Sequence, residues 1–270
     1  MFGNATAENK GIRVLCRRGR VHPPAAHPRC RVRDNLMKLF CCFTSAHEVL
    51  FKTVFAPSVP EGFSLHSEPI ELAGGGDFLS PEFLRCINRK MELVLESLRT
   101  NRGEVIVWAD IDIRFFSLAP DDLRVDLGEH DIAFQREGKR GQYVNTGLFV
   151  CRANQRAIDF FRRVSAALQE HPQVNEQIAV NQLLVDESAL SWTHLPLRYY
   201  ARTHGWPPPS DLALYHANAT MGPDGVARKL RQFRDLDLLR RFPILGLAIT
   251  SIKFAPKRLK RLLTERPDAE

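Results

Sequence analysis

The most constraining feature of the sequence is a run of β-branched and aromatic residues that ends in two aspartates. Residues 105–108 read Val-Ile-Val-Trp without a polar break, and Asp110 and Asp112 follow. Such a run predicts a strand that is buried on both faces, as in a parallel sheet. Residues two apart point to the same side of an extended backbone. The sequence therefore predicts a buried strand whose solvent-facing end presents two carboxylates on one side.

A reason is needed for two carboxylates at the end of a buried strand. Without a partner they would repel each other, and their desolvation would be costly. Mg²⁺ and Mn²⁺ prefer oxygen ligands and keep positions open for phosphate oxygens, so a divalent cation with a nucleotide would remove that cost. The simpler alternative is a solvated strand end at which Asp112 pairs with Arg114.

Length and composition limit the possible classes of protein. A chain of 270 residues with 44% hydrophobic residues can form one large domain or two small ones. We expect no ordinary transmembrane helix, because no run of 18 apolar residues occurs, and no secretory signal peptide. The six cysteines form no Cys-x-x-Cys pair, so we expect no zinc site and predict a reducing, cytoplasmic location.

Positive charge is concentrated at the two ends of the chain. Residues 1–35 hold eight Lys and Arg against two acidic residues, and residues 227–270 hold twelve against five. Because the whole chain carries +7, the part between them is net acidic, which argues against a nucleic-acid partner. We predict a disordered basic segment over 1–36, a folded domain over 37–227 and a basic helical extension over 228–270.

The extension allows two interpretations. Apolar residues 243–254 stand beside a Lys/Arg-rich stretch, a pattern that suits peripheral contact with the anionic inner face of a membrane. The alternative is a helix that docks on the folded domain and keeps its basic face in water.

The rest of the chain alternates between strand and helix patterns. Thr44 and Ser45 follow the first strand, so they are candidates for nucleotide contacts or for the cap of the next helix. Lys90 is interpreted as a surface lysine beside an apolar stripe, or as a residue that reaches a phosphate. Residues 117–130 are polar and contain a proline. Strands are predicted at 39–43, 63–72 (an edge, because of Pro69), 131–135, 143–152, 195–199 and 212–215, and helices at 46–57, 80–98, 155–168, 175–185 and 228–241.

The order of four stretches resembles a known family. They read VIVWADIDIRFF, VNTGLFVCRANQRAIDFF, NEQIAVNQLL and YHANATMGPDGVARK. Over about residues 37–230 the chain is similar to the GT-A-fold glycosyltransferases of the nucleotide-diphospho-sugar transferase type. The resemblance implies a single α/β domain with a Rossmann-like, mixed, mainly parallel sheet flanked by helices.

The resemblance also implies a metal and phosphate site. Asp110 and Asp112 match the family's Asp-x-Asp pair, which holds a divalent metal on the donor diphosphate, and His216 matches the late histidine that completes the site. Lys229 resembles the lysine that neutralises phosphate, although it follows the histidine at a longer distance. Lys90 matches a basic helix residue that precedes the Asp-x-Asp strand.

On the sugar side the resemblance implies a second group of residues. Asn145 and Gly147 match the segment that lines the sugar pocket. Glu176 and Gln177 stand where the family often has an acidic residue followed by Gln, and Asn175 precedes them. Which of these three meets the sugar stays open. The candidate catalytic residues are Gln177, Asn145 and Glu176.

The expected function is therefore transfer of a sugar from a nucleotide-diphosphate sugar, UDP-linked, to a glycan or lipid-linked acceptor with Mn²⁺ or Mg²⁺. A metal and a lysine would stabilise the departing diphosphate. The alternatives are a metal-dependent phosphohydrolase or nucleotidyltransferase, and a non-catalytic protein that binds nucleotide sugars. The stereochemistry of transfer stays open, because no carboxylate base can be assigned from the sequence.

Overall fold

The computed structural model describes residues 36–71, 81–138, 141–218 and 224–244, together with 246, 248 and 249. The predicted disordered segment lies outside the described residues except for Leu36, and so do the glycines at 74–76. Among the described helices, none combines the length and the apolar character that crossing a membrane requires.

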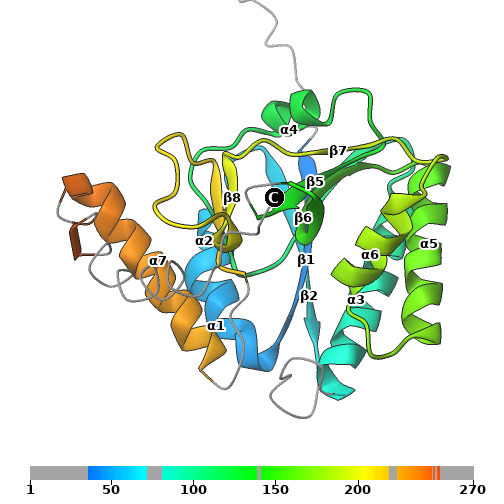
Figure 1. Cartoon of the computed structure of the whole chain (residues 1–270), viewed down its shortest axis with the longest axis horizontal. Coiled ribbons are helices and arrows are strands. Elements are labelled where there is room, and N and C mark those ends of the chain that lie inside the picture. Colours follow the sequence, from blue (N-terminus) through cyan, green and yellow to red (C-terminus); the bar gives the residue numbers. More distant parts are fainter. Residues whose placement is uncertain are drawn as a thin grey trace, which may run out of the picture. The chain divides into compact units, whose positions relative to one another are not determined.

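A six-stranded sheet forms the centre of the fold (Figure 1). Its order is β2-β1-β3-β6-β5-β7, with β6 antiparallel to both of its neighbours and every other adjacent pair parallel. The predicted mixed, mainly parallel sheet is therefore confirmed, as is the position of the Pro69 strand at the edge. The bounds are β1 Met37–Thr44, β2 Phe63–Ile70, β3 Val105–Ala109, β5 Ile132–Glu137, β6 Tyr143–Arg152 and β7 Trp192–His194.

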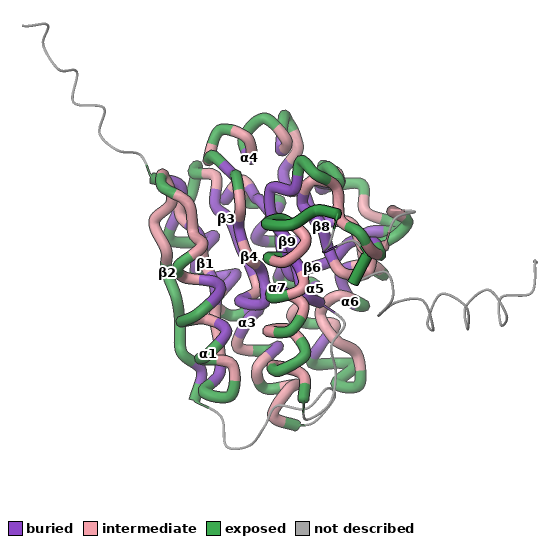
Figure 2. Tube along the Cα trace, turned by 90° about the vertical axis from the view of Figure 1, so that its left-hand side faces the viewer, coloured by how far each residue is buried: buried purple, intermediate pink, exposed green. Residues whose placement is uncertain are grey.

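Helices cover both faces of this sheet, and β3 is buried between them as predicted (Figure 2). Ile106 and Trp108 belong to the core beneath α3 (Pro81–Thr100), α5 (Gln155–Glu170) and α6 (Glu176–Val185). Val107 and Ala109 belong to the opposite core. That second core lies under α4 (Pro120–Leu127), α7 (Gly225–Arg241) and a helical segment made of η1 Ser45–His47, α1 Glu48–Leu50, η2 Phe51–Phe55 and α2 Ala56–Ser58.

A second sheet of three strands begins shortly after the end of β3. It contains β4 (Ile113–Phe115), β9 (Leu214–His216) and β8 (Tyr199–Ala201), in the order β4-β9-β8, and the 3₁₀ turn η3 (Arg202–His204) follows β8. In the antiparallel pairing of β4 with β9, Ile113 stands opposite His216. Because Ile113 directly follows Asp112, this register brings a residue more than a hundred positions away beside the Asp-x-Asp pair.

Local chemistry accounts for where several helices begin. The side chains of Asn154 and Asn175 accept hydrogen bonds from the backbone N–H groups of Ala157 and Ile178, and so cap α5 and α6. The helix α7 begins at Gly225, three residues before the predicted extension, and buries Phe233 and Leu236 against the domain.

One helix was not predicted, and one predicted strand is wrong. The polar stretch 117–130 contains α4, which has Pro120 at its first position and buries two leucines, Leu123 and Leu127, one turn apart. The expected strand at 195–199 is mostly a turn, in which Tyr199 N–H donates to the Pro196 carbonyl, and β8 begins only at Tyr199. Both segments are too short for the apolar periodicity to identify them.

Candidate functional site

The two aspartates lie in a tight turn rather than along the extended strand. The strand β3 ends at Ala109, and the N–H of Ile113 donates to the carbonyl of Asp110 over 3.2 Å. The two side chains also differ in exposure, because Asp110 keeps 35% of its side-chain surface and Asp112 only 9%. The expectation of a solvent-facing position is therefore wrong for Asp112, which is buried.

The predicted convergence of Asp110, Asp112 and His216 is confirmed. One potential ligand atom from each of the three lies within 4.8 Å of the others. Asp112 Oδ1 is 3.1 Å from His216 Nε2. The strand pairing β4–β9 produces this contact, and the N–H of Ala217 adds a hydrogen bond of 2.9 Å to the carbonyl of Asp112.

A glutamine fixes which nitrogen of His216 faces the carboxylates. Gln135 uses its Nε2 to donate to the carbonyl of Tyr199, so its Oε1 acts as the acceptor at 2.7 Å from His216 Nδ1. With the ring proton on Nδ1, the lone pair of Nε2 points at Asp112 Oδ1. A cation shared between Nε2 and Oδ1, whether a metal ion or a proton, would suit this separation of 3.1 Å, and hydrogen bonds like the one from Gln135 orient histidines that bind metals.

Gly147, on β6, packs directly against His216 and Asp110. A Cβ atom there would lie 2.3 Å from His216 Cε1, 2.9 Å from Asn145 Oδ1 and 3.0 Å from Asp110 Oδ2. Only glycine leaves room for the three side chains to approach one another. The contact also shows that Asp110 turns its Oδ2 atom toward the histidine.

Lys90 is buried and pairs with the candidate ligand Asp110, so its interpretation as a surface lysine is wrong. Its Nζ atom lies 2.8 Å from Asp110 Oδ1, 3.0 Å from Glu176 Oε1 and 3.4 Å from the carbonyl of Thr146. Burial alone would lower the pKa of Lys90, but the two carboxylates outweigh it and raise that pKa. Burial raises the pKa of Asp110, and Lys90 opposes that shift.

Lys229 neutralises the other carboxylate. Its Nζ atom is 2.7 Å from Asp112 Oδ2. Burial acts to raise the pKa of Asp112, but Lys229 and His216 together hold it well below its usual range. The simpler alternative, in which Asp112 pairs with Arg114, is wrong, because Arg114 donates to both carboxylate oxygens of Asp237 at 2.7 Å.

The end of β1 borders the same centre. Thr44 makes no side-chain bond to a backbone N–H, and its hydroxyl instead lies 2.9 Å from His47 Nδ1, while Ser45 is exposed. The pKa of His47 is lowered by burial and then by the positive charge of Lys229, against the opposing charge of Asp112. Nucleotide contacts by Thr44 and Ser45 stay a prediction. His47 is a neighbour of the site that sequence reasoning missed.

The residues predicted for the sugar side separate into different roles. Asn175 caps α6, and Glu176 is held by Lys90, so neither points freely into a pocket. Asn145 and Gln177 instead donate to Glu137 Oε2, at 2.5 Å and 3.5 Å. Sequence reasoning missed Glu137 and Gln135. Their signal was two polar residues, two positions apart, at the end of β5.

The donor set suits a hard divalent cation. Two carboxylate oxygens and one imidazole nitrogen are ligands that Mn²⁺ accepts, and Mg²⁺ favours the oxygens. Asp110 Oδ2, Asp112 Oδ1 and His216 Nε2 would hold it, since Lys90 and Lys229 already occupy the other carboxylate oxygens.

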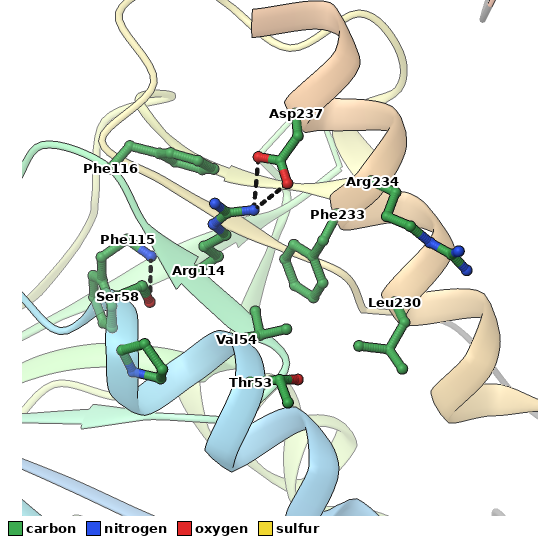
Figure 3. Close-up of a pocket in the computed structure, with 11 residues that line it drawn as sticks. Thr53, Val54, Ser58, Arg114, Phe115, Phe116, Leu230, Phe233, Arg234 and Asp237 are labelled. Carbon is green, nitrogen blue, oxygen red and sulfur yellow. Dashed lines mark hydrogen bonds and ion pairs between the residues drawn. The ribbon is translucent and has the colours of Figure 1, made fainter. Parts of the chain in front are cut away.

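A separate groove of about 770 Å³ lies on the other side of β4 (Figure 3). It runs between the helical segment before β2 and α7, and the ion pair of Arg114 with Asp237 crosses it. Its apolar lining includes Val54 and Phe233, and none of the predicted site residues lines it. The groove is therefore not the metal centre.

Comparison with known proteins identifies the family. Residues 59–224 match the profile of a family described as nucleotide-diphospho-sugar transferase. The chain belongs to this family. The matched range contains Asp110, Asp112 and His216, so the transferase family signature and the converging ligands lie in the same part of the chain.

Individual relatives of this chain are distant. An uncharacterized protein of Arabidopsis thaliana, At1g28695, is 29% identical over 94 residues, which are 35% of this chain and 28% of that protein. The glycosyltransferase GlyE of Streptococcus pneumoniae TIGR4 is 12% identical, with 68% of this chain and 56% of that chain covered and a TM-score of 0.48. A glycosyltransferase involved in glycosylation of the major capsid of PBCV-1 is 13% identical, with 72% and 98% covered and a TM-score of 0.49.

Proposed function

We propose that this protein is a glycosyltransferase that moves a sugar from a UDP-linked donor to a glycan or lipid-linked acceptor with Mn²⁺ or Mg²⁺. The observation that carries the proposal is the meeting of Asp110, Asp112 and His216 in a chain of the nucleotide-diphospho-sugar transferase family. The cation supplies positive charge for the diphosphate of the donor.

The residues of the chain have distinct parts in this proposal. Lys229 adds a second positive charge beside Asp112, where it stabilises the diphosphate that leaves when the sugar–phosphate bond breaks. Lys90 holds Asp110 in place from inside the protein. Gln135 keeps His216 in the tautomer that presents Nε2.

A binding and turnover experiment tests the proposal. UDP and a panel of UDP-sugars are added to the full chain with Mn²⁺, with Mg²⁺ or with EDTA, and the melting temperature is followed. We expect UDP to raise it with the cation and not with EDTA, because a ligand that binds only the native state stabilises it. A chain that binds neither UDP nor any UDP-sugar in Mn²⁺ would refute the proposal.

Turnover separates the alternatives. Release of UDP that increases with a saccharide acceptor indicates transfer. Release that ignores every acceptor favours a phosphohydrolase. Tight binding without turnover favours a non-catalytic nucleotide-sugar-binding protein.

We further propose that the C-terminal end of α7 contacts an anionic membrane from its inner, cytoplasmic face. The guanidinium of Arg241 lies 5.4 Å from the ring of Phe242, and Phe242 and Ile244 are 47% and 89% exposed. Apolar side chains next to arginines fit an interface of anionic lipid. Co-sedimentation with vesicles containing phosphatidylglycerol should weaken for Ile244→Asp and not for Val185→Asp, a control that is 79% exposed at the end of α6. Equal binding of both variants would contradict it.

A further inference from the structure

Glu137, at the end of β5, has an unusual set of partners. Three neutral amides from different segments donate to its Oε2 atom: Asn145 at 2.5 Å, Asn218 at 3.3 Å and Gln177 at 3.5 Å. The side chain is half-buried, and within the described ranges no Lys, Arg or His forms an ion pair with it. A carboxylate that is taken partly out of water needs hydrogen bonds or a positive charge, and here neutral amides supply the hydrogen bonds.

The Oε1 atom of Glu137 differs from Oε2 in its hydrogen bonding. Among the described residues, no hydrogen-bond donor reaches Oε1. A carboxylate has acceptor positions on both oxygens, and an ionised one accepts hydrogen bonds only. The three amides therefore fix the orientation of the group without cancelling its charge.

One amide side chain connects Glu137 to the metal centre. Asn145 donates from Nδ2 to Glu137, and its Oδ1 accepts a hydrogen bond of 2.8 Å from the N–H of Gly147. Gly147 is the residue whose absent Cβ leaves room for His216 and Asp110. The carboxylate of Glu137 is thus connected through Asn145 and Gly147 to the candidate metal ligands His216 and Asp110.

We infer that Glu137 accepts hydrogen bonds from hydroxyl groups of the transferred sugar and restricts the donor to neutral sugars. This inference rests on the proposed function. Hydrogen bonds from hydroxyls to an ionised carboxylate are among the stronger ones. A uronic acid would instead bring a second carboxylate against Glu137, and like charges that meet without a cation disfavour binding.

Among the described residues, the two lysines nearest the candidate metal site do not offset this repulsion. Lys90 pairs with Asp110 and Glu176, and Lys229 pairs with Asp112. In this arrangement Asn145 and Gln177 are positioning residues for Glu137 rather than groups that react.

The test compares the contribution of the sugar with that of the nucleotide. Calorimetry in Mn²⁺ measures the affinities of UDP, UDP-glucose, UDP-galactose, UDP-xylose and UDP-glucuronic acid for the wild type, Glu137→Gln and Glu129→Gln. Glu129 is exposed and precedes β5, so its variant makes the same charge change away from the site.

In the wild type we expect at least one neutral UDP-sugar to bind more tightly than UDP, and UDP-glucuronic acid to bind more weakly than that sugar. Glu137→Gln should keep the affinity for UDP within about twofold, weaken the neutral UDP-sugar at least about tenfold and reduce the discrimination against UDP-glucuronic acid. Glu129→Gln should match the wild type in its affinity for UDP, its affinity for the neutral UDP-sugar and its discrimination against UDP-glucuronic acid.

Three results would overturn the inference: an unchanged gain from the neutral sugar in Glu137→Gln, a wild type that gains nothing from any neutral sugar, or a preference of the wild type for UDP-glucuronic acid. A wild type that does not bind UDP at all refutes the proposed function instead. If Glu137→Gln does not fold, as judged by its melting curve, Glu137→Asp keeps the charge with a shorter reach and should weaken the same sugar and not UDP.

Discussion

Replacing Gly147 by alanine should disable the metal centre without unfolding the protein. The new Cβ would lie 2.3 Å from His216 Cε1, whereas ordinary contacts begin near 3.4 Å, so the ring must move by about 1 Å. Metal–ligand distances tolerate only about 0.2 Å, so the histidine would no longer complete the site. We expect Mn²⁺-dependent UDP affinity to fall by about 100-fold or more, with about 1–3 kcal/mol lost from the free energy of unfolding.

Calorimetry of UDP binding in Mn²⁺ and a urea unfolding curve measure the two effects separately. The matched control is Gly103→Ala, before β3, where φ is +85° and no atom lies within 4 Å of the new Cβ. Backbone strain alone should cost that variant about 1–2 kcal/mol, and its UDP affinity should stay unchanged. If Gly147→Ala binds UDP with Mn²⁺ as the wild type does, the packing argument for this metal site is wrong.

Three further variants test other parts of the structure. Asp112→Asn should lower turnover at least about 100-fold, which corresponds to a loss of about 2.7 kcal/mol of transition-state stabilisation. A chelator should reduce the turnover of this variant little further. Turnover that stays near the wild-type value and still depends on metal would contradict the assignment of Asp112 as a ligand. Lys90→Met leaves the carboxylates of Asp110 and Glu176 without their cation, so urea unfolding at pH 7 should show a loss of about 3 kcal/mol; an unchanged midpoint would be inconsistent with the buried network. Burial acts to raise the pKa of Asp131, but hydrogen bonds from an arginine, a backbone N–H and an asparagine lower that pKa below 3.8. The ionised carboxylate therefore stabilises the folded protein above about pH 4, and this contribution disappears in stronger acid. The melting-temperature difference between the wild type and Asp131→Asn should therefore be constant from about pH 5 to 8 and shrink below about pH 4, and a difference that grows in acid would show the opposite sign.

Much of the fold could be predicted because its signals are local. The apolar run of β3, the helical spacing in α3 and α5, and the proline that marks the edge strand β2 are each contained in a few neighbouring residues. Periods of two and 3.6 residues are properties of one segment, so they need no knowledge of its partners. The short helix α4 and the strand β8 were missed because they span too few residues to show a period.

Part of the site could be predicted for a different reason. Asp110, Asp112, His216 and Lys229 were found through the order of motifs along the chain, and the structure brings them together. The sequence did not reveal that Asp112 is buried, because burial depends on what packs above the turn.

Only the tertiary structure decided the surroundings of these ligands. The pairing of β4 with β9 sets the position of His216, and contacts over 81 residues join it to Gln135 and join Asn218 to Glu137. The sequence by itself determined most of the longer elements, which follow from local composition, and the identity of the candidate ligand residues, which follows from the order of motifs along the chain. Which side chains meet across those elements depends on strand register and helix packing, and a shift of one residue would point each side chain to the other face.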